Sequence, residues 1–342
     1  MNINKIKEKL NTKEYDFLKT NKDLGNNIIL LTLGGSHAYG TNTETSDIDI
    51  RGVALNKPQE LLGLSEFEQF IDLETDTTIY SFNKIIKLLL NCNPNVVEIL
   101  GCRDEHYFIL SEEGKMIKDN VSLFLSKIAF SSFGGYANAQ LRRLQNALAR
   151  DNYPQSEKEK HIAGSIENQM VHFNNVYTRF KESSINIYLD DTNKEGFDKE
   201  IYMDIDLKHY PLRDFKAIYS EMSNVVKDYD KLNHRNKKKT EISLNKHSMH
   251  LVRLFLMGID ILSGAGVCTY RDKDLDLLMS IRQGNYMKED GSYRDEFFEL
   301  VDKLEKDFQY AYKNSTLPQT PDMKKVEEFV IEINKKSLWK EN

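Results

Sequence analysis

The segment GGSHAYGTNTETSDIDIRG, residues 34–52, follows the apolar run NIILLTL at residues 27–33. A continuous apolar run of this length predicts a β-strand that is covered on both faces. The paired glycines that follow predict a turn at the end of that strand. A turn-rich stretch then leads to residues 47–55, in which acidic and apolar residues alternate. Alternation with a period of two predicts a second strand.

The second strand and the glycine turn carry residue types that suit phosphate chemistry. Successive side chains of a strand point to opposite faces, so Asp47, Asp49 and Arg51 are expected on one face. Two neighbouring carboxylates favour hard divalent cations such as Mg²⁺ or Mn²⁺. The turn offers the backbone N–H of Gly35 and the hydroxyl of Ser36, groups that hold phosphate oxygens. Together these features predict a site for a metal-bound nucleoside triphosphate.

The rest of the chain changes from mixed to mostly helical signals. Residues 68–80 read as a third extended stretch, and residues 81–92 as a helix with Ser81 as its N-cap. Helical periodicity is expected over residues 112–127, 136–150, 157–182, 212–232, 241–263, 273–283, 295–313 and 323–336. Residues 185–189 and 200–206 are two short strand candidates that can form a hairpin.

Composition places the chain among folded proteins. The 342 residues are 40% hydrophobic and 29% charged, which is too apolar for a disordered protein. At about 150 residues per domain, this length favours two domains. The net charge of -6 excludes a uniformly basic nucleic-acid coat but allows a local basic patch.

Cysteine content and apolar runs bear on the compartment. The three cysteines show no CxxC spacing, which argues against a disulfide framework and a structural zinc site. The sequence contains no apolar run near the roughly 20 residues that span a bilayer, so we expect no membrane insertion. A reducing, cytoplasmic location fits these observations.

A family resemblance rests on the motif just described. Gly35-Ser36 followed by Asp47-x-Asp49 resembles the signature of the DNA polymerase beta superfamily of nucleotidyltransferases. The longer segment is similar to a bacterial and phage branch of nucleotidyltransferases, some of which are linked to RNA repair. Downstream stretches of the same branch resemble Asn93-Pro94-x-x-x-Glu98-x-Leu100 and His247-x-x-His250-x-x-Arg253-Leu254. The resemblance implies an α+β fold. We expect a mixed-sheet catalytic domain over residues 1–125 and a mostly helical nucleotide- and acceptor-binding domain over residues 126–342.

The resemblance also implies a third carboxylate on the strand that precedes the next helix. Asp72, Glu74 and Asp76 compete for this role. Alternation places all three on the same strand face, so the pattern alone does not choose between them. Asp76 is the first choice because it is nearest to the helix that begins at Ser81, and Glu74 is the second.

The implied reaction moves a nucleoside monophosphate from a nucleoside triphosphate to a hydroxyl and releases pyrophosphate. Asp47, Asp49 and Asp76 are the expected catalytic and metal-binding residues, with Mg²⁺ or Mn²⁺ as the cofactor. The expected nucleotide-binding residues are Gly35, Ser36, Arg51, His250 and Arg253. The last two lie on one helix face, where an alternative role is to stabilise a contact between domains.

The chemical class of the acceptor is inferred from the family resemblance alone. The family branch implies RNA, for example a tRNA-like acceptor, and the preferred nucleoside triphosphate, ATP or another, stays open. An alternative enzyme is a protein nucleotidyltransferase of the toxin-antitoxin type, which would modify a partner protein. A third alternative is a nucleotide sensor that binds the metal-bound triphosphate without catalysis.

Overall fold

The structure is a computed structural model that describes residues 3–151, 166–167, 169–173, 175–177, 185–191, 199–234 and 241–339. Contacts between residues divide the chain into two compact units. The first unit combines Met1–Leu144 with Glu241–Asn342, and the second unit is Gln145–Thr240. Most of the helix expected over residues 157–182 falls outside the described residues.

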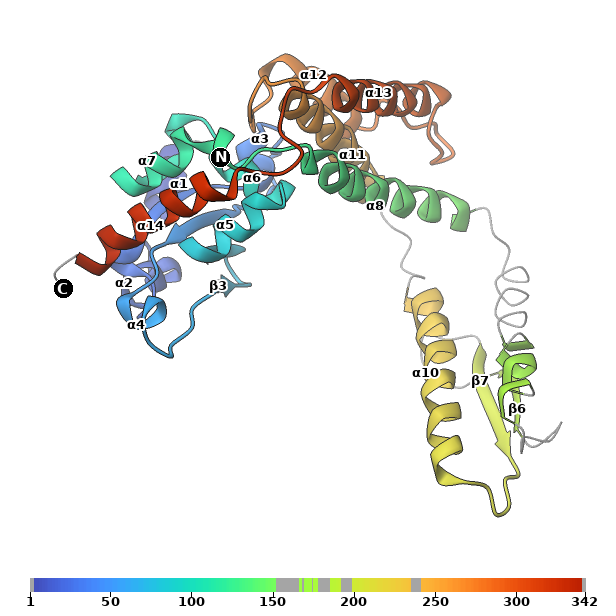
Figure 1. Ribbon diagram of the computed structural model, residues 1–342. Coiled ribbons are helices and arrows are strands. Elements are labelled where there is room, and N and C mark those ends of the chain that lie inside the picture. The colour runs from blue at the N-terminus through green and yellow to red at the C-terminus, as the bar shows by residue number, and fades with distance from the viewer. Residues whose placement is uncertain are drawn as a thin grey trace. The chain divides into compact units, whose positions relative to one another are not determined.

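A five-stranded mixed sheet forms the centre of the first unit (Figure 1). Its strands are β1 (Ile28–Leu33), β2 (Ile50–Ala54), β3 (Gln69–Asp72), β4 (Thr77–Ser81) and β5 (Tyr107–Leu110), in the order β3-β4-β2-β1-β5. β2 and β4 are parallel, whereas the other neighbouring strands are antiparallel. This sheet and the helical remainder of the unit confirm the expected α+β class.

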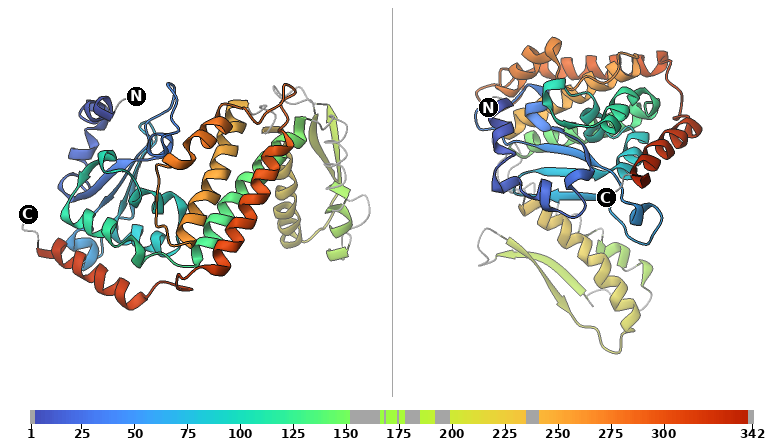
Figure 2. Two further views of the ribbon diagram at one scale, coloured as in Figure 1. Left: turned by 90° about the horizontal axis from the view of Figure 1, so that it is seen from above. Right: turned by 90° about the vertical axis from the view of Figure 1, so that its left-hand side faces the viewer.

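Helices of the first unit come from both ends of the chain (Figure 2). Those of its first segment are α1 (Ile3–Lys9), α2 (Phe17–Thr20), α3 (Gly35–Tyr39), α4 (Pro58–Leu61), α5 (Phe82–Leu90), α6 (Pro94–Leu100), α7 (Glu112–Asp119) and α8 (Ile128–Asp151), whose end passes into the second unit. Those of its second segment are α11 (Glu241–Leu262), α12 (Leu275–Arg282), α13 (Asp295–Asn314) and α14 (Met323–Trp339). The predicted cap of α5 is confirmed, since the Ser81 hydroxyl accepts a hydrogen bond from the Lys84 N–H at 3.2 Å.

Two of the predicted strands have different bounds in the structure. All six residues of β1 are buried, as the apolar run predicts. β2 begins only at Ile50, so Asp47 and Asp49 precede the strand. Residues 68–80 form a hairpin, not one strand, because the Asp72 carboxylate accepts hydrogen bonds from the N–H and the hydroxyl of Thr75 and closes a turn. Strand alternation therefore does not relate Asp72 to Asp76.

Aromatic side chains join the long helices of the first unit. Phe308 of α13 stacks on Phe130 of α8 with ring centroids 4.9 Å apart and meets Phe255 of α11 edge-on at 5.7 Å. Gly258 of α11 permits this approach, because a Cβ atom there would lie 2.6 Å from the Phe308 ring. Figure 1 shows α11, α12 and α13 gathered at one end of this unit.

The last helix, α14, contacts residues that lie next to the sheet in the sequence. The Ser337 hydroxyl of α14 donates to the Asn56 carbonyl at 2.6 Å, and the Asn334 amide donates to Asn83 at 3.0 Å. Phe329 packs edge-on against Phe124, with ring centroids 5.7 Å apart. These contacts attach the C-terminal segment to the part of the chain that forms the sheet.

The second unit contains a hairpin and a helix. β6 (Ile185–Asp191) and β7 (Lys199–Ile205) pair in antiparallel register, which confirms the expected hairpin. α10 (Leu212–His234) follows them along the chain. An apolar cluster joins these elements and consists of Ile166, Phe173, Ile185, Ile187, Ile218 and Met222.

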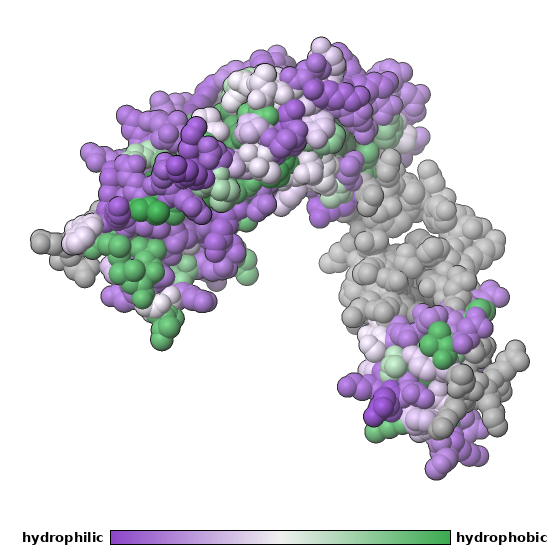
Figure 3. Space-filling model, in the orientation of Figure 1, coloured by the Kyte–Doolittle hydropathy of each residue, from purple (hydrophilic) through white to green (hydrophobic). Residues whose placement is uncertain are grey.

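The surface of the described residues is largely hydrophilic in the view of Figure 3. Among the exposed apolar side chains, Leu62 and Leu64 follow α4, and Leu73 lies in the turn between β3 and β4. No helix within the described ranges combines the length and apolarity that crossing a bilayer requires.

The packing of Phe308 leads to a first prediction. Phe308 is 2% exposed, so its replacement by alanine leaves a cavity between α8, α11 and α13. We expect Phe308→Ala to lower the free energy of unfolding by about 3 to 5 kcal/mol. Urea unfolding followed by circular dichroism measures the change. Tyr310→Ala is the control, because Tyr310 lies on the same helix and is 70% exposed. Equal losses in both variants would contradict this packing.

Candidate active site

The glycine turn places α3 against the acidic residues. The Gly34 N–H donates to the Asp49 carbonyl at 2.8 Å, which fixes the end of β1 beside the residues that precede β2. Gly35 has a φ of 53°, in the left-handed region that favours glycine. A Cβ atom at Gly35 would lie 1.8 Å from Oδ2 of Asp49. The turn and the Asp49 carboxylate are therefore in direct contact, and only a glycine fits between them.

The parallel pairing of β2 with β4 brings a second carboxylate to Asp49. Ile50 is the register partner of Thr77, and the Ile50 N–H donates to the Asp76 carbonyl at 3.1 Å. The residues that precede these partners, Asp49 and Asp76, therefore lie side by side. Nη2 of Arg51 lies 3.0 Å from Oδ1 of Asp76 and 3.5 Å from Oδ1 of Asp49. We call Asp49 and Asp76 the acidic pair.

The electrostatics of the acidic pair favour bound positive charge. Burial raises the pKa of Asp49 to about 7, and its hydrogen bond with Asp76 adds to the rise. That same hydrogen bond lowers the pKa of Asp76, and Arg51 lowers it further. A proton on Asp49 therefore relieves the repulsion between the two carboxylates. A cation that replaced the proton would remove the repulsion between them.

The structure separates the three candidates for the third carboxylate. Asp72 is engaged in the turn, where it accepts hydrogen bonds from Thr75 at 3.0 and 2.7 Å. Glu74 lies exposed in that turn. Asp76 is the candidate that reaches Asp49, and its φ of 45° turns the backbone so that β4 can begin at the next residue.

Asp47 lies in the loop before β2, and its side chain is exposed. Among the residues that the structure describes, no three His, Cys, Asp or Glu side chains form a group that could hold a metal ion. Two members of the predicted triad are therefore assembled, and Asp47 stands apart from them.

The predicted phosphate-binding residues occupy two different environments. Ser36 is buried at the start of α3, and its carbonyl accepts the Thr41 N–H at 2.9 Å. The Arg51 guanidinium is held by the acidic pair and by the carbonyls of Ile50 and Asp76. Arg51 therefore offsets part of the negative charge of the acidic pair in this structure.

Arg253 is engaged in a buried cluster at the other end of α3. It is 3% exposed, and its Nη1 donates to Oε2 of Glu98 at 3.1 Å. The Tyr39 hydroxyl donates to the same oxygen at 2.8 Å, and the Arg253 guanidinium lies 3.7 Å from the centre of the Tyr39 ring. This geometry matches the alternative role of a structural contact, since it joins α3, α6 and α11. Glu98 was not among the predicted site residues, although an acidic residue within the apolar helix PNVVEIL is a signal of a buried ion pair.

Two further residues of α11 lie near the site: His250 lies next to α3, and Lys246 acts on the acidic pair. His250 packs edge-on against Tyr39, with ring centroids 6.0 Å apart. Burial lowers the pKa of His250 well below its usual value, so the ring is neutral. The positive charge of Lys246 lowers the pKa of both Asp49 and Asp76. Lys246 was absent from the predicted site residues because only the fold brings α11 to the sheet.

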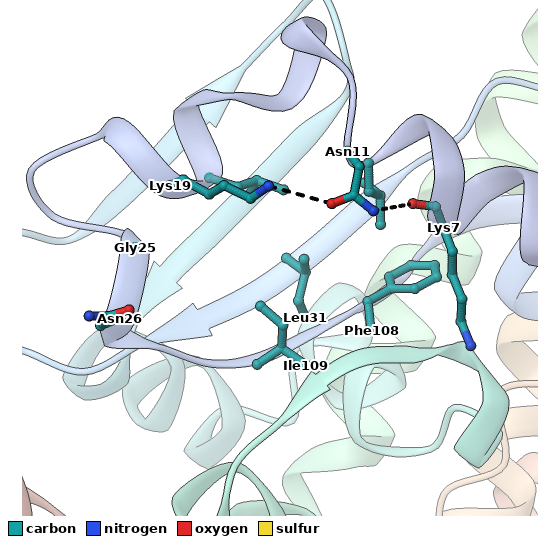
Figure 4. Close-up of a pocket in the computed structure, with 10 residues that line it drawn as sticks. Lys7, Asn11, Lys19, Gly25, Asn26, Leu31, Phe108 and Ile109 are labelled. Carbon is teal, nitrogen blue, oxygen red and sulfur yellow. Dashed lines mark hydrogen bonds between the residues drawn. The ribbon is translucent and has the colours of Figure 1, made fainter.

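A cavity of about 570 Å³ lies elsewhere in the first unit (Figure 4). Lys7, Lys19 and Phe108 are among its lining residues, together with Leu31 of β1. Leu31 alternates with Thr32, the register partner of Arg51, so Leu31 points to the opposite face of the sheet. The cavity is therefore separate from the acidic pair.

Comparison with known proteins identifies a family for the part of the chain that carries the acidic pair. Residues 5–163 match the model of the family RlaP, described as RNA repair pathway DNA polymerase beta family. The match confirms the resemblance that Gly35-Ser36 and Asp47-x-Asp49 indicate. No curated protein and no solved structure matches the chain.

The contact at Gly35 leads to a second prediction. Gly35→Ala forces a strained φ and a clash with Asp49, so we expect the free energy of unfolding to fall by about 1 to 3 kcal/mol. Urea unfolding measures this change in the free energy of unfolding. Gly135→Ala is the control, because a Cβ atom at this helical position meets nothing within 4 Å. The control should be neutral or more stable by up to about 1 kcal/mol. A Gly35→Ala protein as stable as the control would rule out the contact.

The raised pKa of Asp49 leads to a third prediction. The folded protein binds more protons than the unfolded chain between the usual pKa of 3.8 and about 7, so stability falls as the pH rises through this range. An amide in place of the carboxylate carries no charge at any of these pH values. We expect Asp49→Asn to be more stable than the wild type by about 1 to 2 kcal/mol at pH 8 without divalent cations, and equally stable near pH 4. The expected gain is less than the full shift because the hydrogen bond with Asp49 lowers the pKa of Asp76, and the substitution weakens this favourable effect.

Chemical denaturation at several pH values tests this dependence. Asp302→Asn is the control, since Asp302 lies exposed on α13. Its effect should stay within about 0.5 kcal/mol at every pH. An Asp49→Asn protein that is less stable than the wild type at pH 8 would show that the acidic pair is not strained by its charge.

Proposed function

We propose that this chain, a member of the DNA polymerase beta superfamily over residues 5–163, transfers a nucleoside monophosphate from a nucleoside triphosphate to a hydroxyl acceptor. The observation that carries the proposal is the contact of the acidic pair with the glycine turn. Asp49 touches Gly35 on one side and Asp76 on the other. A backbone turn suited to phosphate and two carboxylates suited to a divalent cation therefore meet at one point.

The acidic pair fits a divalent cation by its chemistry. Carboxylate oxygens are the ligands that Mg²⁺ and Mn²⁺ prefer. Burial raises the pKa of Asp49, and a bound cation would favour its ionised form. Asp49 and Asp76 would hold the cation, and Asp47 would join them through a change of its exposed loop. A bound cation supplies stabilisation of the charge on the triphosphate and lowers the pKa of the acceptor hydroxyl.

The residues of the chain have separate tasks in the proposed reaction. The Gly35 N–H and the Ser36 hydroxyl hold phosphate oxygens of the triphosphate. The acceptor oxygen attacks the α-phosphorus, and the bond from that phosphorus to the bridging oxygen of pyrophosphate breaks. The carboxylate of Asp76, whose side chain is 55% exposed, takes the proton of the hydroxyl. Arg51 keeps the acidic pair oriented by its contacts with both carboxylates.

RNA is the proposed acceptor. The support comes from the description of the matched family, which names an RNA repair pathway. Protein nucleotidylation and nucleotide sensing without catalysis predict different products, so one labelling experiment separates the three functions.

The test uses the full chain with each of the four α-labelled nucleoside triphosphates, total RNA and lysate protein, with and without Mg²⁺ or Mn²⁺. We expect label on RNA only when the divalent cation is present. Label on a protein band would support protein nucleotidylation instead. Triphosphate binding without release of pyrophosphate would indicate a sensor.

Variants of the acidic residues give the fourth prediction. Asp49→Asn and Asp76→Asn should each reduce transfer at least about a hundredfold, because each removes a carboxylate at the reacting centre. Glu74→Gln is the matched control, since Glu74 lies exposed in the same turn as Asp76. It should keep activity within about twofold, as expected of a surface change. Full activity in Asp49→Asn would overturn the mechanism, and loss in Glu74→Gln alone would assign the third carboxylate to Glu74.

A further inference from the structure

Arg282, in the C-terminal half of the chain, contacts the loop that precedes β2 and carries Asp47. It is the last residue of α12, and its Nη2 donates to the Ser46 hydroxyl at 3.2 Å. Ser46 directly precedes Asp47. Arg282 lies outside residues 5–163, the segment that matches the RlaP family.

The Arg282 guanidinium lacks a negative partner. Among the residues that the structure describes, no Asp or Glu forms an ion pair with Arg282, and its Nη1 is buried without a hydrogen-bond partner. Burial lowers the pKa of Arg282, which shows that the charge is poorly compensated. The buried Arg271 is different, because Asp260 and Asp274 both contact it. Arg282 is only partly buried, but its buried Nη1 atom has no partner, so its environment suits an anion from outside the chain.

Two further unpartnered polar atoms belong to the segment around α3. His37 is 6% exposed, and its Nε2 has no hydrogen-bond partner in the described part of the structure. Thr41 is fully buried, and its Oγ1 also has no hydrogen-bond partner among the described residues. The positive charge of Arg282 lowers the pKa of His37, so this ring lies near the guanidinium. Buried polar atoms are rarely left unpaired, and their gathering here points to a polar ligand.

A second cation lies in the same region. The charges of Lys246 and Arg282 both lower the pKa of His250. The charge of Lys246 also lowers the pKa of Asp49 and Asp76. α11 therefore brings one positive charge near the acidic pair, and the end of α12 brings another to Ser46, three residues before Asp49. Arg51 is occupied by the acidic pair, which leaves Arg282 and Lys246 as cations that can meet an anion there.

We propose that Arg282, with Lys246 beside it, binds the terminal phosphates of the nucleoside triphosphate. The phosphates would lie between the glycine turn and the end of α12, with the α-phosphate at the acidic pair. A guanidinium suits this role, because its planar set of donors matches phosphate oxygens. The inference rests on the proposed function and deepens it, since it explains how the site distinguishes a triphosphate from a monophosphate.

The test compares nucleotide binding by the full chain and two variants in the presence of Mg²⁺. Arg282→Met removes the charge, and Arg282→Lys keeps it without the planar donors. We expect Arg282→Met to weaken ATP binding about tenfold to a hundredfold and to leave AMP binding within about twofold. Arg282→Lys should fall between Arg282→Met and the wild type. Equilibrium dialysis, with AMP measured by competition, gives the dissociation constants.

A matched control removes the same charge elsewhere. Arg294 is exposed, and its Nε donates to the Met287 carbonyl at 3.4 Å. Arg294→Met should bind ATP as the wild type does. Circular dichroism and the urea midpoint check the folding of each variant, and Arg282→Lys carries the comparison if Arg282→Met does not fold.

The possible results separate this inference from the proposed function. Wild-type protein that binds no nucleoside triphosphate would overturn both. Wild-type protein that binds ATP, with Arg282 variants that bind it equally well, would overturn the inference alone. Equal weakening of ATP and AMP binding would also overturn it, because a purely structural arginine has that effect.

Discussion

The parallel pairing of β2 with β4 is the constraint on which the rest of the site depends. It makes Asp49 and Asp76 neighbours at the same end of two strands, although they are 27 positions apart in the sequence. Two carboxylates this close repel each other when both are ionised, and burial of Asp49 adds to that cost. Arg51 and the charge of Lys246 offset part of it. The protein thus keeps a costly arrangement whose cost a bound cation would remove.

α3 connects this pair to the rest of the first unit. Gly35 at its start fits against Asp49, and Tyr39 at its end donates to Glu98, which Arg253 also contacts. Both ends of a five-residue helix are therefore fixed by other groups: Asp49, directly before β2, at one end, and side chains of α6 and α11 at the other. A helix from the C-terminal half, α11, thus contacts α3 through the stacking of Arg253 on Tyr39. The first unit accordingly joins both ends of the chain, and the functional division at residue 125 stays a prediction.

Local patterns in the sequence were enough to predict β1, the turn at Gly34-Gly35, the cap at Ser81 and the pairing of β6 with β7. The choice of Asp76 came from the family resemblance and its place nearest to the following helix, because the alternation did not choose between Asp72, Glu74 and Asp76. Alternation failed at residues 68–80, since the contact of Asp72 with Thr75 makes a turn that strand patterns do not reveal. The partners of Arg253 and Arg282 depend on contacts between distant segments, and no local pattern contains them.

The most direct test of the central claim is a crystal structure of the wild-type chain with Mn²⁺ and a non-hydrolysable nucleoside triphosphate. The anomalous signal of Mn²⁺ locates the ion independently of the protein atoms. We expect a peak within ligand distance of both Asp49 and Asp76, with the triphosphate against Gly35 and Ser36. A peak bound by other side chains, or a triphosphate bound away from the acidic pair, would contradict the account.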